Sequence, residues 1–184
     1  MTRILSALIL MLAFPLFAGA QTSQGVCLND TKISTASITS VGDALVTVAH
    51  WAELPTCAGQ QSYTASSREY DIAVLKAAEP GECRNVEPGE GLVYEGFPGD
   101  SGQEAELEQD TGELVSTGFE FELEPGRLVK GLDVGTSRTV RAGYSGGAVR
   151  SKADGRLVGI IVGQNGNYTA FTPIETVCAI IRTG

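Results

Sequence analysis

The sequence predicts an all-β protein, either a sandwich or a barrel. Short runs of apolar and β-branched residues recur along the chain, and turn residues separate them at short intervals. Glycine is abundant, at 23 of 184 residues, whereas runs with helical apolar spacing are few. Hydrophobic residues make up 42% of the chain. This fraction is high enough to exclude an intrinsically disordered chain.

The first 20 residues have the layout of a secretory signal peptide. A basic start precedes an almost purely apolar run at residues 4–17, and small residues follow at 18–20. The alternative is a membrane anchor, but the run is shorter than the ~20 residues that span a bilayer, and Pro15 interrupts it. We therefore expect cleavage after Ala20, a secreted or periplasmic protein of residues 21–184, and no stable membrane insertion.

The first half of this remaining chain contains strands and one helical turn. Two β-branched runs separated by a Gly-Asp turn predict a hairpin. A helical turn follows and ends at a proline, and a polar strand or loop then precedes an apolar strand. In chain order these elements are Ile33–Val41, Ala44–Val48, the helical turn Ala49–Leu54, Gln60–Ser67 and Tyr70–Leu75.

The middle of the chain is strongly acidic. Residues 79–124 carry 14 acidic side chains and one basic side chain, Arg84. Such a run is usually a solvated surface, and glycines and prolines divide it. We expect a connection between two halves, followed by solvent-facing strands at Gly91–Phe97, Glu104–Leu107 and Leu114–Leu123.

The last part of the chain contains the most apolar strand. Leu157–Val162 is a continuous apolar run bounded by turn residues, which is typical of a buried strand. Further strands are expected at Gly131–Val140, Ala148–Arg150 and Tyr168–Pro173. Residues Glu175–Arg182 have helical spacing and predict a short C-terminal helix.

Charge and cysteine content argue against a nucleic-acid binder and against a zinc protein. The formal net charge is −9, which argues against a nucleic-acid binder because phosphate binding needs a basic surface. The four cysteines are widely spaced and the chain has a single histidine, which disfavours a zinc site. In an exported protein two disulfides are expected. Three pairings are possible; we expect Cys57–Cys83 and Cys27–Cys178, because each closes a separate loop.

Three places carry side chains suited to catalysis. Ser145 lies in the glycine-rich segment 143–147, where glycines let the backbone turn sharply and point successive N–H groups into one hollow. His50, the only histidine, follows an apolar strand. Asp71 begins another apolar strand. Each has a plainer explanation by itself. The serine segment could be an ordinary glycine-rich loop, His50 a structural histidine, and Asp71 an exposed strand end.

The order of these residues separates the hydrolase classes. The serine segment also matches the nucleophile elbow of α/β-hydrolases, but in that fold a histidine follows the serine, and none follows Ser145. Subtilisin-type enzymes run Asp, His, Ser. Asp30 and Asp43 do precede His50, but the alternating strands and long helices of that fold are missing here. The order His50, Asp71, Ser145 is that of the chymotrypsin type.

Four segments in this order resemble the chymotrypsin/trypsin-like serine protease family, in its compact bacterial or viral form. Leu45–His50 is similar to the strand that leads into T-A-A-H, and Asp71–Leu75 to D-I-A-L-L. Gly143–Val149 resembles G-D-S-G-G-P-L, and Leu157–Ile161 resembles L-V-G-I-V. The resemblance covers nearly all of residues 31–182.

The resemblance implies two antiparallel β-barrels with a short C-terminal helix, one peptidase domain in all. The first barrel would span about residues 27–92 and the second about 93–184, with the active site in the cleft between them. It also implies a serine endopeptidase that acts on peptides or proteins and needs neither metal nor organic cofactor. We expect a monomer.

The resemblance also assigns roles to the site residues. Ser145 would be the nucleophile, and His50 would take its proton and later give it to the leaving amine. An unperturbed imidazole, with a pKa of ~6.5, suits both steps. Asp71 would orient the imidazole. The N–H groups of Gly143 and Ser145 would form the oxyanion hole.

Substrate recognition involves a further set of residues. By resemblance, Val162, Gly163 and Gln164 would pair with the substrate backbone as an added strand. Thr139 would lie near the floor of the pocket for the residue before the scissile bond, and it has no charge to select Arg or Lys. Tyr144 replaces the family's aspartate that receives a new N-terminus, so trypsin-type zymogen activation is not expected.

Two other functions are compatible with the sequence. The same fold serves non-catalytic binding modules, which usually lack a member of the triad, whereas all three are present here. An esterase could use the same triad. The expected substrate-pairing strand favours peptides.

Overall fold

The computed structural model describes residues 21–28, 33–54, 63–99 and 105–184. The signal peptide predicted for residues 1–20 lies outside them, as does the beginning of the strand predicted at Glu104–Leu107. In chain order the elements are β1 Thr22–Leu28, β2 Ile33–Val41, β3 Ala44–Val48, α1 Ala49–Ala52, β4 Ala65–Ser67, β5 Ile72–Lys76, β6 Gly91–Gly96, β7 Glu108–Glu124, β8 Arg127–Thr136, β9 Ala148–Ser151, β10 Leu157–Asn165, β11 Tyr168–Pro173 and α2 Ile174–Thr183.

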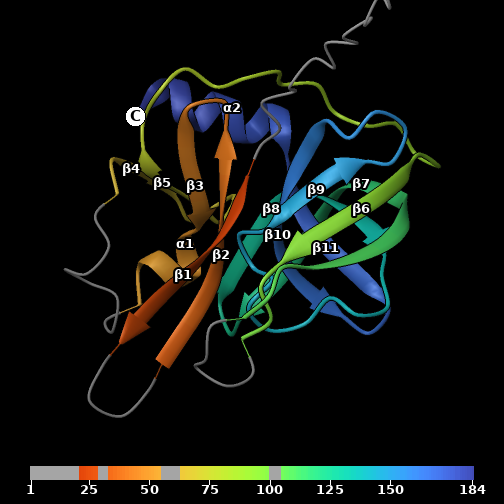
Figure 1. The fold of residues 1–184 in the computed structure, drawn as a ribbon, viewed down its shortest axis with the longest axis horizontal. Coiled ribbons are helices and arrows are strands. Elements are labelled where there is room, and N and C mark those ends of the chain that lie inside the picture. The colour runs from red at the N-terminus through yellow and green to blue at the C-terminus, as the bar shows by residue number, and fades with distance from the viewer. Residues whose placement is uncertain (1–20, 29–32, 55–62, 100–104) are drawn as a thin grey trace, which may run out of the picture.

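The chain forms two antiparallel β units, with the short helix α2 at its end (Figure 1). β1–β5 form a five-stranded sheet in the order β1-β2-β3-β5-β4. The six strands β10-β11-β8-β7-β6-β9 close into a barrel. This architecture confirms the predicted all-β class and the C-terminal helix.

Strand β1 was not predicted. Its sequence contains Ser, Gln and Gly, which have weak or unfavourable strand propensity. It nevertheless pairs with β2 along its whole length, from Thr22 opposite Thr39 to Leu28 opposite Ile33. Pairing with an existing strand therefore determines its conformation, whereas local propensity does not.

Strand β7 is longer than predicted. Separate strands were expected at 104–107 and 114–123, but one strand runs from Glu108 to Glu124. Its first part pairs with β6 and its later part pairs with β8, so two different partners stabilise one continuous strand. Its acidic side chains are mostly exposed, as predicted for this part of the chain.

One hydrophobic cluster joins the two units. Val177 and Ile181 of α2 pack with Val46 and Ile72 of the first sheet and with Ile160 of β10. The helix therefore covers the junction rather than one unit alone. Because all five side chains are nearly or completely buried, this contact holds the first sheet against the barrel.

Both predicted disulfide pairings are wrong. Cys83 is bonded to Cys178 with a Cα–Cα distance of 6.2 Å, so Cys83 cannot pair with Cys57, nor Cys178 with Cys27. Cys57 itself lies outside the described residues. The chain between β5 and β6 runs past α2 (Figure 1), and the disulfide fastens it there across 95 residues. The prediction assumed that each pair closes a separate loop, whereas the path of this connection determined the partner.

A buried carboxylate lies in the barrel, apart from the predicted catalytic residues. Asp133 of β8 is only 4% exposed. Burial raises its pKa to about 6, although a hydrogen bond from the Gly118 backbone, at a bulge in β7, acts in the opposite direction. The native state therefore holds this proton to a higher pH than the unfolded chain does. The contribution of Asp133 to the free energy of unfolding should therefore fall as the pH rises from about 4 to about 6.

We predict that Asp133→Asn increases the free energy of unfolding at pH 7.5 by about 2 kcal/mol, because the ionised carboxylate is costly to bury. At pH 4 the variant and the wild type should differ little, since both then carry a neutral side chain. Urea unfolding at both pH values measures the difference. Asp43→Asn, in an exposed turn, is the matched control. An equal gain at both pH values would contradict the prediction.

Candidate active site

Strand pairing brings His50 and Asp71 together. β3 and β5 are antiparallel neighbours, with Val48 opposite Ile72. His50 follows the end of β3 within α1, and Asp71 directly precedes β5. The Ala49 N–H also donates to the Asp71 carbonyl at 3.1 Å. Two residues that are 21 positions apart in sequence are therefore in direct contact.

The Asp71 carboxylate binds His50 through both its oxygens. The His50 Nδ1–H donates to Oδ2 at 2.6 Å, and the His50 backbone N–H donates to Oδ1 at 2.8 Å. Asp71 is fully buried, and its φ of +55° is the only positive value of a non-glycine residue in the described ranges. Strained backbone of this kind is concentrated at functional sites. Because a carboxylate only accepts, it keeps the ring proton on Nδ1 and leaves Nε2 as an acceptor.

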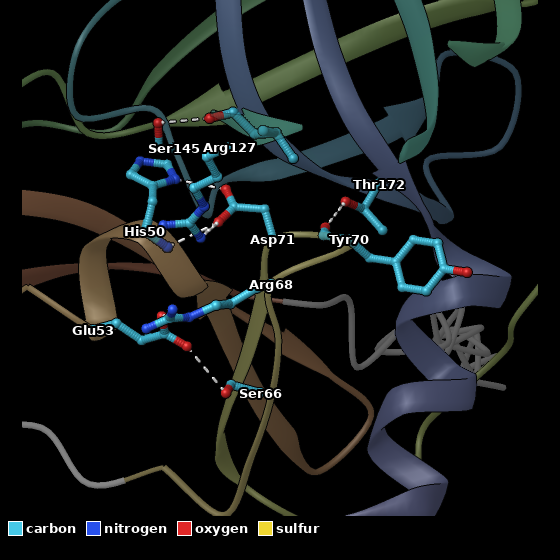
Figure 2. Close-up of polar contacts among 10 residues, drawn as sticks. His50, Glu53, Ser66, Arg68, Tyr70, Asp71, Arg127, Ser145 and Thr172 are labelled. Carbon is cyan, nitrogen blue, oxygen red and sulfur yellow. Dashed lines mark hydrogen bonds and ion pairs between the residues drawn. The ribbon is translucent and has the colours of Figure 1, made fainter. Parts of the chain in front are cut away.

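A third donor to Asp71 was not predicted. The Arg127 guanidinium donates from Nη2 to Asp71 Oδ1 at 2.7 Å (Figure 2). Arg127 is the first residue of β8 and follows the β7–β8 turn, so it reaches the first sheet from the barrel. Its side chain is 20% exposed, which makes this a largely desolvated ion pair.

Buried hydroxyl groups of the first sheet hold the serine segment. The Ser37 N–H donates to the Ser145 carbonyl at 2.8 Å, and Ser37 Oγ donates to the Gly143 carbonyl at 2.9 Å. Thr39 Oγ1 donates to the Gly146 carbonyl at 2.9 Å. Ser37 and Thr39 are completely buried. The segment that carries Ser145 is thus attached to the opposite unit at three carbonyl groups.

Ser145 lies beside the His50 ring in Figure 2, but its hydroxyl is bonded elsewhere. Ser145 Oγ donates to the Val162 carbonyl at 3.0 Å. Val162 is the extra residue at a bulge of β10, between Ile161 and Gly163, which turns its carbonyl out of the regular ladder. Within the described residues, no hydrogen bond joins Ser145 Oγ to His50.

The predicted oxyanion donors have no intramolecular acceptor. Within the described part of the chain, neither the Gly143 N–H nor the Ser145 N–H donates to another protein atom. Gly143 has a φ of +92°, and a Cβ there would lie 2.3 Å from the Gly99 nitrogen and the Phe97 oxygen. Only glycine fits this position.

A cavity of about 200 Å³ lies next to Ser145. It is lined by Val140, Arg141, Ala142, Tyr144, Ser145, Ile161, Gly163 and Gln164. Thr139 is not part of this lining; its N–H donates to Asp110 at 2.7 Å, as does the Arg138 N–H at 2.6 Å. Despite partial burial, which acts in the opposite direction, hydrogen bonds from backbone N–H groups lower the pKa of Asp110. Asp110 therefore holds the loop that leads into the cavity.

Charge in this cavity is balanced by Glu108. Arg141 donates two hydrogen bonds of 2.8 Å to the Glu108 carboxylate, and the Arg141 guanidinium lowers the pKa of that group. The Tyr144 hydroxyl also donates to Glu108, at 3.2 Å. Burial, and then the charge of Glu108, raises the pKa of Tyr144 to about 12. At the position where the family's aspartate was expected, a neutral tyrosine therefore anchors the loop through a neighbouring carboxylate.

The edge of β10 beyond its bulge is open on one side. β9 pairs with β10 only as far as Ile160, and Ile161 exchanges backbone hydrogen bonds with Gly146 and Gly147. Gly163 and Gln164 pair with β11 on the other side. Within the described residues, Gly163 and Gln164 thus have no strand partner on the side next to Ser145, and an extended peptide could add one strand there.

A second cavity, of about 680 Å³, lies beside His50. Residues of α1, of the segment before β5 and of the β7–β8 hairpin line it. Among the described residues, no group of three or more His, Cys, Asp or Glu side chains gathers as a metal ion would require.

None of the described helices has the length and apolarity to cross a bilayer.

Solved structures resemble this fold. The active form of the Rv3671c protease from M. tuberculosis has a TM-score of 0.63 at 15% identity, over 88% of this chain and 79% of that one. The MamO protease domain from Magnetospirillum magneticum has a TM-score of 0.61 at 18% identity, over 85% of this chain and 93% of that domain. Deg5 has a TM-score of 0.60 at 18% identity, over 86% and 85%.

The chain has the chymotrypsin-like fold. No family profile matches the sequence, and no curated protein matches it. At such low identity the likeness establishes architecture, and function must be argued from the site. In this chymotrypsin-like fold His50 and Asp71 come from the first sheet, and Ser145 comes from the barrel.

Sequence reasoning missed the residues that hold the site together. Ser37 and Thr39 lie two positions apart on one strand, so they share a face, and this alternation of hydroxyl groups was the available signal. No sequence pattern pointed to Arg127 or Glu108 as residues of the site. Their partners depend on the length of the β7–β8 hairpin and on the closure of the barrel.

Proposed function

We propose that this protein is a secreted serine endopeptidase that hydrolyses peptide bonds through Ser145, His50 and Asp71. The observation that carries the proposal is the buried Asp71 carboxylate, bonded to Nδ1 of the only histidine, with Ser145 beside the ring (Figure 2). This arrangement leaves Nε2 as the proton acceptor that a serine nucleophile requires.

In the proposed reaction, the Ser145 hydroxyl leaves the Val162 carbonyl by rotation about its Cα–Cβ bond and turns to His50 Nε2. Oγ attacks the peptide carbonyl carbon while Nε2 takes the hydroxyl proton. The Gly143 and Ser145 N–H groups stabilise the oxyanion of the tetrahedral intermediate. The imidazolium then gives its proton to the leaving amine, and an acyl-enzyme remains.

The second half of the reaction reverses these roles. Water replaces the leaving amine, and Nε2 removes one of its protons as the oxygen attacks the acyl carbon. A second tetrahedral intermediate collapses, the proton returns to Ser145 Oγ, and the carboxylic acid product leaves. Asp71 stays ionised throughout and stabilises the imidazolium.

The substrate is proposed to lie as an extended strand along Gly163 and Gln164. The side chain before the scissile bond would then occupy the cavity of about 200 Å³. Because Glu108 offsets the charge of Arg141, we expect a small uncharged side chain there rather than Arg or Lys. This preference can be measured by incubating the purified protein of residues 21–184 with a peptide library and identifying the cleaved bonds.

The test of the proposed activity is labelling with a fluorophosphonate probe. The wild type should label at Ser145, whereas Ser145→Ala and His50→Ala should not label. Ser23→Ala, on the exposed side of β1, should label like the wild type. A correctly folded wild type that does not label would indicate a binding module. Labelling with turnover of small esters but not of peptides would indicate an esterase.

A further inference from the structure

We propose that Arg127 is a positioning residue that shares the Asp71 carboxylate with His50 and weakens the imidazole as a base. The consequence for catalysis rests on the function proposed above. The contact itself does not, because it is a property of the folded protein. It also links the two units of the fold, since Arg127 belongs to the barrel and Asp71 to the first sheet.

The two oxygens of the Asp71 carboxylate accept from different donors. Oδ2 accepts only the Nδ1–H of His50, whereas Oδ1 accepts both the His50 backbone N–H and Arg127 Nη2. The buried Arg127 Nε has no hydrogen-bond partner among the described residues. Asp71 is therefore the group that holds this guanidinium. In return, a third donor restrains the carboxylate in the orientation that faces the imidazole.

The charges lead to a second effect. While His50 is neutral, Asp71 and Arg127 form a pair with no net charge, and the Asp71 side chain is fully buried. Protonation of His50 places a second cation on the same carboxylate, close to the first. Repulsion between the two cations opposes that protonation. Arg127 should therefore keep His50 in its basic, catalytically competent form at a lower pH than Asp71 alone would allow.

Other charged groups near His50 should affect its protonation less than Arg127 does. Those that line the cavity beside it are Glu53, Arg68, Glu69, Glu124 and Lys130. Arg68 is paired with Glu53 at 2.7 Å and is 77% exposed. Glu69, Glu124 and Lys130 are also exposed. Solvent and salt screen such groups. Among the described residues, Arg127 is the one cation besides His50 in an ion pair with Asp71.

The single histidine makes the test direct, because its NMR signals need no assignment among several rings. Arg127→Met and Arg127→Gln should raise the midpoint of the His50 titration by about one pH unit. The Gln variant keeps a hydrogen-bond donor without the charge, and it also serves if the Met variant does not fold. Arg127→Lys restores the cation and should recover at least half of the shift. Lys130→Met removes a cation from the same cavity and should move the midpoint by less than about 0.2 units.

Catalysis provides the second measurement. The acid limb of the pH profile of kcat/KM should move upward with the NMR midpoint in Arg127→Met and Arg127→Gln. Its plateau should fall about tenfold in the Met variant, because Asp71 loses a restraining donor. A folded Arg127→Gln variant with an unchanged midpoint would overturn the proposal. If the wild type has no activity, the proposed function fails, whereas the NMR titration still tests the role of Arg127.

Discussion

Asp71→Asn should lower kcat/KM for peptide substrates by about 10⁴-fold. Within the described residues, three groups hydrogen-bond to this carboxylate and all are donors: the His50 ring N–H, the His50 backbone N–H and Arg127 Nη2. An asparagine offers one oxygen, and its NH2 group must then face a donor. The imidazole can relieve this contact by moving its proton to Nε2. In that tautomer Nε2 cannot accept the proton of Ser145.

The kinetics of hydrolysis and the rate of fluorophosphonate labelling measure this effect. Both should fall together, because both require Nε2 to accept the serine proton. Asp43→Asn makes the same chemical change in an exposed turn and should retain the wild-type rate. The far- and near-UV circular dichroism of each variant shows whether it is folded. A folded Asp71→Asn enzyme with less than a tenfold loss would exclude the triad role.

Gly146→Ala should destabilise the protein by about 4 kcal/mol and eliminate labelling of Ser145. Gly146 has a φ of +84°, and a Cβ there would lie 2.0 Å from the Ser37 carbonyl oxygen and 2.5 Å from Thr47 Oγ1. Both neighbours are in the first sheet and completely buried, so neither can move aside easily. The added methyl group would push the serine segment away from that sheet.

Gly155→Ala separates the steric effect from backbone strain. Gly155 also has a positive φ, of +73°, but a Cβ there meets nothing within 4 Å. This variant should lose only about 1 kcal/mol and should label normally. Urea unfolding of both variants gives the comparison. Equal losses of stability would show that the serine segment is not held tightly between the two units.

Much of the fold could be predicted because strand and turn patterns are local. The hairpin of β2 and β3, the apolar run of β10 and the amphipathic α2 each follow from the periodicity of their own residues. The absence of a histidine after Ser145 excluded the α/β-hydrolase class without any structure, and the missing alternation of strands and long helices argued against the subtilisin class. The identities of these three side chains, and the glycines around Ser145, determine which chemistry the site could perform.

The tertiary structure decided which distant groups meet. Pairing of β3 with β5 brings Asp71 to His50, and closure of the barrel brings Arg127 to the same carboxylate. The Cys83–Cys178 disulfide and the Glu108–Arg141 pair likewise depend on how far each connection travels before it packs. Residue type sets what a side chain can bond to, and the path of the backbone sets which partners lie within reach. Local periodicity carries no information on that path.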